Sequence, residues 1–308
     1  MAIRNFQELI EAAKQYGSKR IVVPMGHDPD VIEGLFLARE HGLAEGILLG
    51  DSDGIKRLCD SLNVDVKIFD VQEETNTDTA ILRSIRMLHE GKADLIMKGK
   101  TTTSEILCAV LNRENKLRTG RSISQVVLFR IPWSERMILF SDAAINILPD
   151  LERKADICRN CIDVAHAIGI DHPNVAVLTA LEQVNPAMPA TVDAAALVQM
   201  NRRHQITGAY LEGPIALDAP LSRFAAERKG IESPLVENTD ILIFPNIEAA
   251  NIFYRSVVYL AGAESGGLVY GSKVPIILLS RAETPEVKLN SIALSVLVAE
   301  YQRKHVQL

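Results

Sequence analysis

Residues 274–281 read Val-Pro-Ile-Ile-Leu-Leu-Ser-Arg, and this stretch decides how the rest of the chain is interpreted. Pro275 to Leu279 is an apolar run of the kind that a strand buried on both faces requires. The next residues, Thr284-Pro285-Glu286, have the order of a helix N-cap, a proline at the first helical position and an acidic first-turn residue. Open α/β sheets bind ligands where buried strands end and helices begin. Ser280 and Arg281 are therefore candidate site residues, with a turn serine and a surface arginine as the alternative.

The chain before this stretch alternates between apolar runs of strand type and helical patterns. Four strands are expected, each followed by a helical pattern, at Arg20–Pro24, Gly46–Gly50, Val66–Asp70 and Ala93–Met97. Such a βαβα rhythm predicts an α/β fold with mostly parallel sheets and helices on both faces.

The fourth expected strand runs into Lys98-Gly99-Lys100-Thr101-Thr102, followed by Glu105. Gly99 permits a tight turn, and Thr102 with Glu105 has the spacing of a capping box for a helix over 106–112. Lysines and hydroxyls at a helix N-terminus suit an anion, because free N–H groups and the helix dipole point there. This stretch is a candidate phosphate-binding loop, although it lacks the spacing of a Walker motif.

From about Gly120 onwards, the pattern of apolar and polar residues in the chain is different. Two apolar runs at 125–129 and 137–142 are close enough to pair as a hairpin, and later strands again alternate with helices. A length of 308 residues exceeds the usual size of a single core, roughly 250 residues, so two domains are expected. Polar and glycine-containing segments at 114–122 and 262–271 are the predicted crossings. The expected domains are therefore 1–119 plus 269–308, and 120–268.

Composition excludes several classes of protein. A formal net charge of -6 argues against nucleic acid as the main partner. No apolar stretch approaches the roughly 18 residues of a membrane-spanning helix. Four cysteines are few for a disulfide framework, and Cys158 and Cys161 lie in a helical pattern without a second ligand pair for zinc. A reduced, cytoplasmic compartment is therefore expected.

Taken together, the motifs resemble those of the phosphate acetyl/butyryl transferase family, and the length resembles its butyryl branch most. The resemblance covers essentially the whole chain. It rests on six motifs in order, at 97–101, 141–146, 178–190, 212–218, 244–246 with Asn251, and 279–281.

The resemblance implies a two-domain fold like that of isocitrate and isopropylmalate dehydrogenases, with the site in an interdomain cleft. It also implies the reaction acyl-CoA + phosphate ⇌ acyl phosphate + CoA, without a metal or a tightly bound cofactor, and a homodimer. Ser280 and Arg281 match active-site residues of the acetyl branch. The substrate-binding residues expected for CoA and phosphate are Lys98, Gly99, Lys100, Thr101, Thr102, Asn246 and Asn251.

Two positions depart from the acetyl branch. Where that branch has an aspartate proposed as the base for the CoA thiol, this chain has Val287, with Glu286 beside it as a candidate substitute. Where that branch has a contributing arginine, this chain has Cys108. These departures favour a butyryl-like or branched acyl group over acetyl.

Other functions stay open at this point. Phosphate acetyltransferase, or a non-catalytic acyl-CoA-binding homologue, is the alternative within the family. A metal-dependent dehydrogenase on the same fold would need several converging aspartates, and no convincing set is evident. His27 and Asp28, which follow the first expected strand, are further candidates to line the site.

Overall fold

The structure is a computed structural model that describes residues 3–278 and 283–305 and divides into two compact units. The terminal unit comprises Phe6–Gly120 with Gly266–Leu308, and the central unit comprises Met1–Asn5 with Arg121–Ser265. The sequence predicts two domains, and that each of them folds independently stays a prediction.

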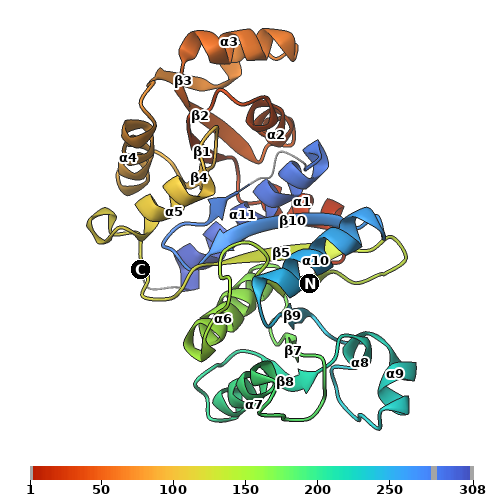
Figure 1. Cartoon of the computed structure of the whole chain (residues 1–308). Helices are drawn as coiled ribbons and strands as arrows, with labels where there is room; N and C mark the ends of the chain where they lie inside the picture. Colours follow the sequence, from red (N-terminus) through yellow and green to blue (C-terminus); the bar gives the residue numbers. More distant parts are fainter. Residues whose placement is uncertain (1–2, 279–282, 306–308) are drawn as a thin grey trace. The chain divides into compact units, whose positions relative to one another are not determined.

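A mostly parallel sheet forms the middle of the terminal unit (Figure 1). Its strands lie in the order β3 (Asp70–Glu73), β2 (Ala44–Gly50), β1 (Lys19–Pro24), β4 (Leu95–Met97), β11 (Ile276–Ile277) and β10 (Glu264–Tyr270). Strands β3, β2, β1, β4 and β11 are parallel to their neighbours, and β10 runs antiparallel to β11. Five strands therefore end at the same edge of the sheet.

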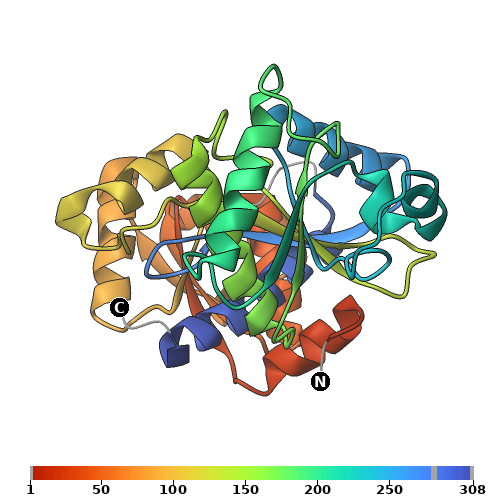
Figure 2. The same cartoon turned by 90° about the horizontal axis from the view of Figure 1, so that it is seen from below.

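The terminal unit also contains α1 (Phe6–Lys14), α2 (Pro29–Glu40), α3 (Ser52–Ser61), α4 (Thr77–His89), α5 (Thr103–Leu111) and α11 (Pro285–His305). Two 3₁₀ turns accompany them, η1 (Val66–Ile68) and η2 (Arg113–Asn115). Helix α11 packs against α1 and α2, and Figure 2 shows α11 in dark blue beside α1 in red.

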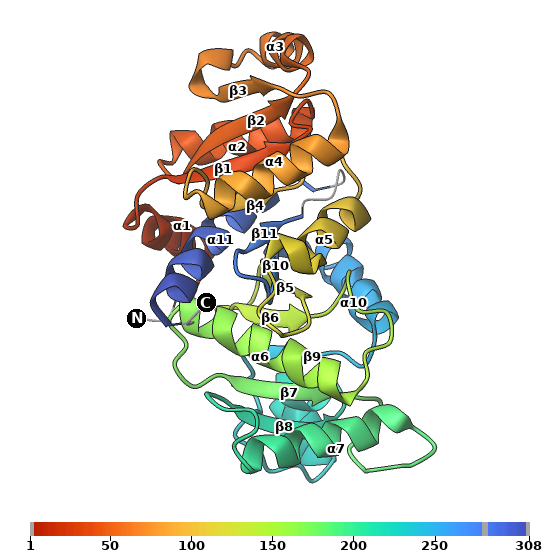
Figure 3. The ribbon, with the colours of Figure 1, turned by 90° about the vertical axis from the view of Figure 1, so that its left-hand side faces the viewer.

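Helices cover both faces of this sheet, as the sequence predicts. A Cβ at Gly46 of β2 would lie 2.9 Å from Leu35 of α2, whereas the next residue, Ile47, lines a hollow with Met87 of α4. Successive residues of a strand point to opposite faces, so α2 and α4 lie on opposite sides of β2. Figure 3 shows both helices beside this strand.

The strands of the central unit are also mostly parallel. They lie in the order β5 (Ser124–Arg130), β6 (Ile138–Ser141), β9 (Ile241–Ile243), β7 (Asn174–Leu178) and β8 (Tyr210–Ile215). The predicted pairing of β5 with β6 is confirmed and is antiparallel; the other pairs are parallel. The helices are α6 (Leu151–Ala167), α7 (Pro189–Arg202), α8 (Asp218–Leu221), α9 (Arg223–Arg228) and α10 (Ile247–Tyr259).

Aromatic side chains fill the core between the central sheet and α10. Phe140 of β6 is fully buried and contacts Phe129, Phe253 and Phe244 edge-on, with ring centroids 5.5–6.0 Å apart. Ser141, the next residue of β6, instead lies beside the buried thiol of Cys161 in α6. Helices α10 and α6 thus cover opposite faces of the central sheet.

One expected strand is wrong, and another strand was not expected. The expected strand over Val66–Asp70 is the 3₁₀ turn η1, because Asp65 caps the Lys67 amide, and the strand begins only at Asp70. The glycine-rich segment 262–271, whose role as a crossing stays a prediction, contains strand β10, which was not expected. A Cβ at Gly266 would lie 2.8 Å from Asn290 Cβ of α11, so glycine here allows close packing of strand on helix.

Candidate active site

Three strands of the terminal unit end at one edge of its sheet. They are β1, which ends at Pro24, β4, which ends at Met97, and β11, which ends at Ile277, and they are parallel neighbours. The Lys98 amide, just after β4, donates to the Ile277 carbonyl of β11 at 2.9 Å. This is the edge at which open α/β sheets bind their ligands.

The loop over 98–102 is fixed against the loop after β1. A Cβ at Gly99 would lie only 2.4 Å from the carbonyl oxygens of both Pro24 and Met25, so no other residue fits without displacing backbone. The Lys100 amide donates to the Met25 carbonyl at 2.8 Å. The predicted capping box is confirmed, because the Thr102 hydroxyl accepts from the Glu105 amide and the Glu105 carboxylate accepts from the Thr102 amide.

The two lysines of this loop have different surroundings. The Lys98 ammonium is half-buried and donates to the carbonyls of Gly99 and Thr101, at 3.2 and 3.4 Å. Lys100 is exposed, and its charge helps to lower the pKa of His27 in the loop after β1. Lys100 is therefore the better placed of the two to meet an anion from solvent.

Ser280 and Arg281 lie outside the described residues, and α11 begins just beyond them at Pro285, as the sequence predicts. Glu286 in its first turn is exposed, and a hydrogen bond with the Thr284 side chain lowers the pKa of its carboxyl group. In the next turn, the fully buried Lys288 donates to Asp30 of α2 at 2.7 Å. This ion pair joins the start of α11 to the start of α2.

The two predicted asparagines lie in the central unit and have local partners. The Asn246 side chain caps α10 by accepting from the Ala249 amide at 2.9 Å. The Asn251 side chain donates to the Ala143 carbonyl at 3.0 Å. Both bonds are structural, and the roles of the two residues in substrate binding stay predictions.

Sequence reasoning missed the part that Asp142 has in the central unit. Its buried carboxylate accepts hydrogen bonds from the amides of Gln125, Ala144, Ile145 and Asn146, and burial nevertheless raises its pKa. The motif at 141–146 is thus a turn built around one carboxylate. Glu182 and Asp218, from two further motifs, are held by the same lysine, Lys229, at 2.7 and 2.6 Å.

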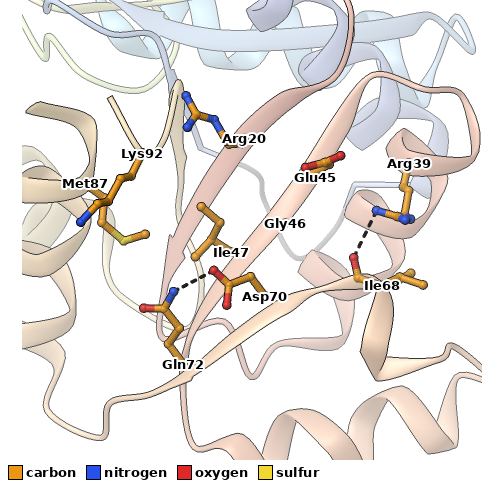
Figure 4. A pocket seen from close by; sticks show the side chains of 10 residues that line it. All are labelled: Arg20, Arg39, Glu45, Gly46, Ile47, Ile68, Asp70, Gln72, Met87 and Lys92. Carbon is orange, nitrogen blue, oxygen red and sulfur yellow. Dashed lines mark hydrogen bonds between the residues drawn. The ribbon is translucent and has the colours of Figure 1, made fainter. Parts of the chain in front are cut away.

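A hollow of about 340 Å³ lies in the terminal unit, but at the opposite edge of the sheet (Figure 4). Arg20, Glu45 and Asp70 line it from the first or second residue of β1, β2 and β3. Its charged groups are largely paired with neighbours; Arg20, for example, binds both oxygens of Asp94. The amino ends of parallel strands are not where such folds place their sites, so we assign this hollow no part in the chemistry.

Within 3–278 and 283–305, no group of three or more His, Cys, Asp or Glu side chains is arranged to hold a metal ion. Across the same described residues, no helix is long and apolar enough to cross a membrane.

Comparisons with known proteins agree along nearly the whole chain. The family described as phosphate acetyl/butaryl transferase matches residues 68–296. Phosphate butyryltransferase of Clostridium acetobutylicum is 40% identical over 297 residues, which are 96% of this chain and 99% of that protein. Phosphate acetyltransferase of Thermotoga maritima is also 40% identical, over 95% of this chain and 99% of its own length.

A solved structure has the same fold. The branched-chain phosphotransacylase of Enterococcus faecalis V583 matches with a TM-score of 0.82 and 25% identity, over 91% of this chain and 99% of that one. The family match and the relatives at 40% identity are sufficient to place the sequence. The chain belongs to the phosphate acetyl/butyryl transferase family.

Proposed function

We propose that this protein is a phosphate acyltransferase that interconverts a short-chain acyl-CoA plus phosphate with an acyl phosphate plus CoA. The observation that carries this function is near full-length similarity to enzymes named for both the butyryl and the acetyl reaction. A butyryl-like or branched acyl group is favoured, with acetyl transfer or a non-catalytic acyl-CoA-binding role as the alternative.

The proposed site is built on the carboxyl edge of the terminal sheet. Phosphate is already an anion near neutral pH, so its attack on a thioester requires positioning more than deprotonation. Arg281 is proposed to hold phosphate through two parallel hydrogen bonds, supported by the loop over 98–102. The Ser280 hydroxyl is proposed to donate to the oxyanion of the tetrahedral intermediate.

The remaining predicted roles form part of the same proposal. Asn246 and Asn251 are proposed to contact substrate, Glu286 to assist proton transfer, and no metal to participate. Cys108, at the position of a contributing arginine in the acetyl branch, is exposed on α5 and offers no charge there. The interdomain cleft, the likeness to isocitrate and isopropylmalate dehydrogenases and a cytoplasmic location are also proposed.

A homodimer is proposed as well, and an apolar surface on the central unit supports it. Ile252 and Tyr259 are about two-thirds exposed and lie seven residues apart, which places them on the same face of α10. Leu260 follows with 86% of its surface exposed. Apolar surface of this kind commonly marks an interface between proteins. Light scattering should give twice the mass of one chain, and the mass of a monomer would contradict the dimer.

The proposed reaction is tested by CoA release from acetyl-, propionyl-, butyryl- and branched acyl-CoA with and without phosphate. Release is expected only when phosphate is present, with one of the longer acyl groups preferred, and EDTA should have no effect. Tight acyl-CoA binding without turnover would instead support the non-catalytic alternative. Release that ignores phosphate, or that EDTA abolishes, would contradict the assignment.

A further inference from the structure

Two polar side-chain atoms are buried without a partner at the carboxyl edge of the terminal sheet. They are Nδ1 of His27 and Oγ1 of Thr101, and within the described residues neither makes a hydrogen bond. Thr101 is only 9% exposed. A buried polar group without a partner costs about 1–3 kcal/mol, so native proteins usually supply one, from protein, water or ligand.

The two residues stand on loops that are locked together. His27 follows β1 and Thr101 follows β4, and these strands are parallel neighbours. The Lys100 amide donates to the Met25 carbonyl at 2.8 Å, and Gly99 packs directly against the Met25 backbone. These contacts fix one loop against the other.

The end of a third strand, β2, limits where the imidazole of His27 can lie. A Cβ at Gly50, the last residue of β2, would lie 3.0 Å from His27 Nδ1, so the absence of a side chain at position 50 leaves room for the ring. The position of the ring is thus set by the ends of β1 and β2, with β4 beside them.

The charges around this cluster suit an oxyanion. Burial first, and then the positive charge of Lys100, lower the pKa of His27, while Asp51 and Asp28 act in the opposite direction. The imidazole is therefore neutral near pH 7 and has one N–H to donate. The Thr101 hydroxyl offers a second donor and Lys100 a positive charge. One oxygen of Asp28 is already occupied by the Asp30 amide at 3.0 Å.

We propose that His27, Thr101 and Lys100 together bind a phosphoryl oxyanion, with His27 as a binding residue that the family's motifs do not include. The inference rests on the proposed function, in which inorganic phosphate and the phosphates of CoA are the two sources of such an oxyanion. Inorganic phosphate is the expected occupant, because Lys100 and Thr101 belong to the loop over 98–102, which is proposed to support phosphate binding.

His27→Phe and Thr101→Val test the proposal by kinetics. Phenylalanine keeps a ring over Gly50 but removes both nitrogens, and valine removes only the hydroxyl. Each change should raise the KM for phosphate about tenfold, the effect of losing one hydrogen bond to a charged group. Thr101→Ser should recover most of the loss. His41→Phe is the matched control, because that histidine bonds Leu37 at the far end of α2.

The two sources are separated by measuring the KM for CoA in the reverse direction. If only the KM for phosphate rises, the cluster binds inorganic phosphate. If only the KM for CoA rises, the cluster binds a phosphate of CoA. Both results support a phosphoryl site. If neither KM changes more than twofold in His27→Phe and Thr101→Val, the proposal is wrong.

A binding measurement keeps this result separate from the proposed reaction. NMR titration of the His27 ring should show its pKa rising when phosphate is added, because a bound anion favours the imidazolium. This readout needs no turnover, so it would detect the site even if the protein released no CoA. A His27 pKa that is unchanged by both phosphate and CoA would overturn the site independently of the kinetics.

Discussion

Glu286 stands one position before Val287, where the acetyl branch of the family carries its proposed base. Its carboxylate is exposed, and the hydrogen bond with Thr284 keeps its pKa low. It is therefore fully ionised throughout the neutral range and cannot produce a change of rate there by its own titration. Neighbouring helical positions also differ by about 100° in direction, so Glu286 does not occupy the place of the missing aspartate.

We expect Glu286→Gln to change the rate from acyl phosphate to acyl-CoA by less than tenfold. The wild-type rate should climb with pH towards the thiol pKa of about 8.5, since phosphate itself or another group takes the proton. Val287→Asp should flatten this climb by supplying a base. The measurement is the pH profile of the reverse reaction for all three proteins. A loss of 100-fold or more in Glu286→Gln, with an unchanged circular dichroism spectrum, would instead make Glu286 the base.

Single residues also show what the sequence reveals about a site. The loop over 98–102 could be found because its signals are local, namely a glycine, lysines and a capping box. From the sequence alone, His27 could be recognised only as a residue that follows an expected strand. Its significance depends on Gly50 and Lys100, which are 23 and 73 positions away in the chain and meet it only in the fold.

At the scale of elements, the pair formed by Lys288 and Asp30 connects α11 to α2. The stem of Lys288 lies over Gly34, whose Cβ would be 3.1 Å from the lysine Cβ, and its side chain is 1% exposed. Asp30 remains one-third exposed, and Glu33 lies 3.9 Å from the ammonium. The burial is thus unequal, with the lysine charge far from water and the carboxylate still partly hydrated.

This inequality predicts unequal effects on stability. Asp30→Asn leaves a buried ammonium with only Glu33, and should lower the free energy of unfolding by about 2 kcal/mol or more. Lys288→Met removes the buried charge and keeps the packing, so it should change stability by less than about 1 kcal/mol. Urea unfolding of both variants measures this, with Glu33→Gln as a control of small effect. Equal losses in the two variants would show that the pair acts as an ordinary surface salt bridge.

Elements were predictable where their signals lie within the segment. Proline at the first position marked the start of α11, and alternation with helices identified β1, β2 and β4. The strand over 66–70 was wrong because a side-chain cap on Lys67 outweighed the apolar pattern. Strand β10 was missed because its Gly266 packs closely on Asn290, and composition cannot show this contact.

At the scale of the whole molecule, each of the two units is built on mostly parallel strands that helices cover on both faces. The fold class follows from the sequence because periodicity and strand composition determine it. The expected domain bounds also place Asn246 and Asn251 apart from the loop over 98–102, and the two compact units separate them in the same way. The proposed function, in which phosphate attacks an acyl-CoA, is the account that gives both sets of residues a role.

The most direct test of that account is the identity of the phosphorus-containing product. Purified protein would be incubated with butyryl-CoA and inorganic phosphate, and the reaction followed by phosphorus NMR alongside CoA release. We predict that an acyl phosphate appears in an amount equal to the CoA released. Free butyrate in place of acyl phosphate, with inorganic phosphate unchanged, would contradict the account, because the protein would then be a thioesterase rather than a phosphate acyltransferase.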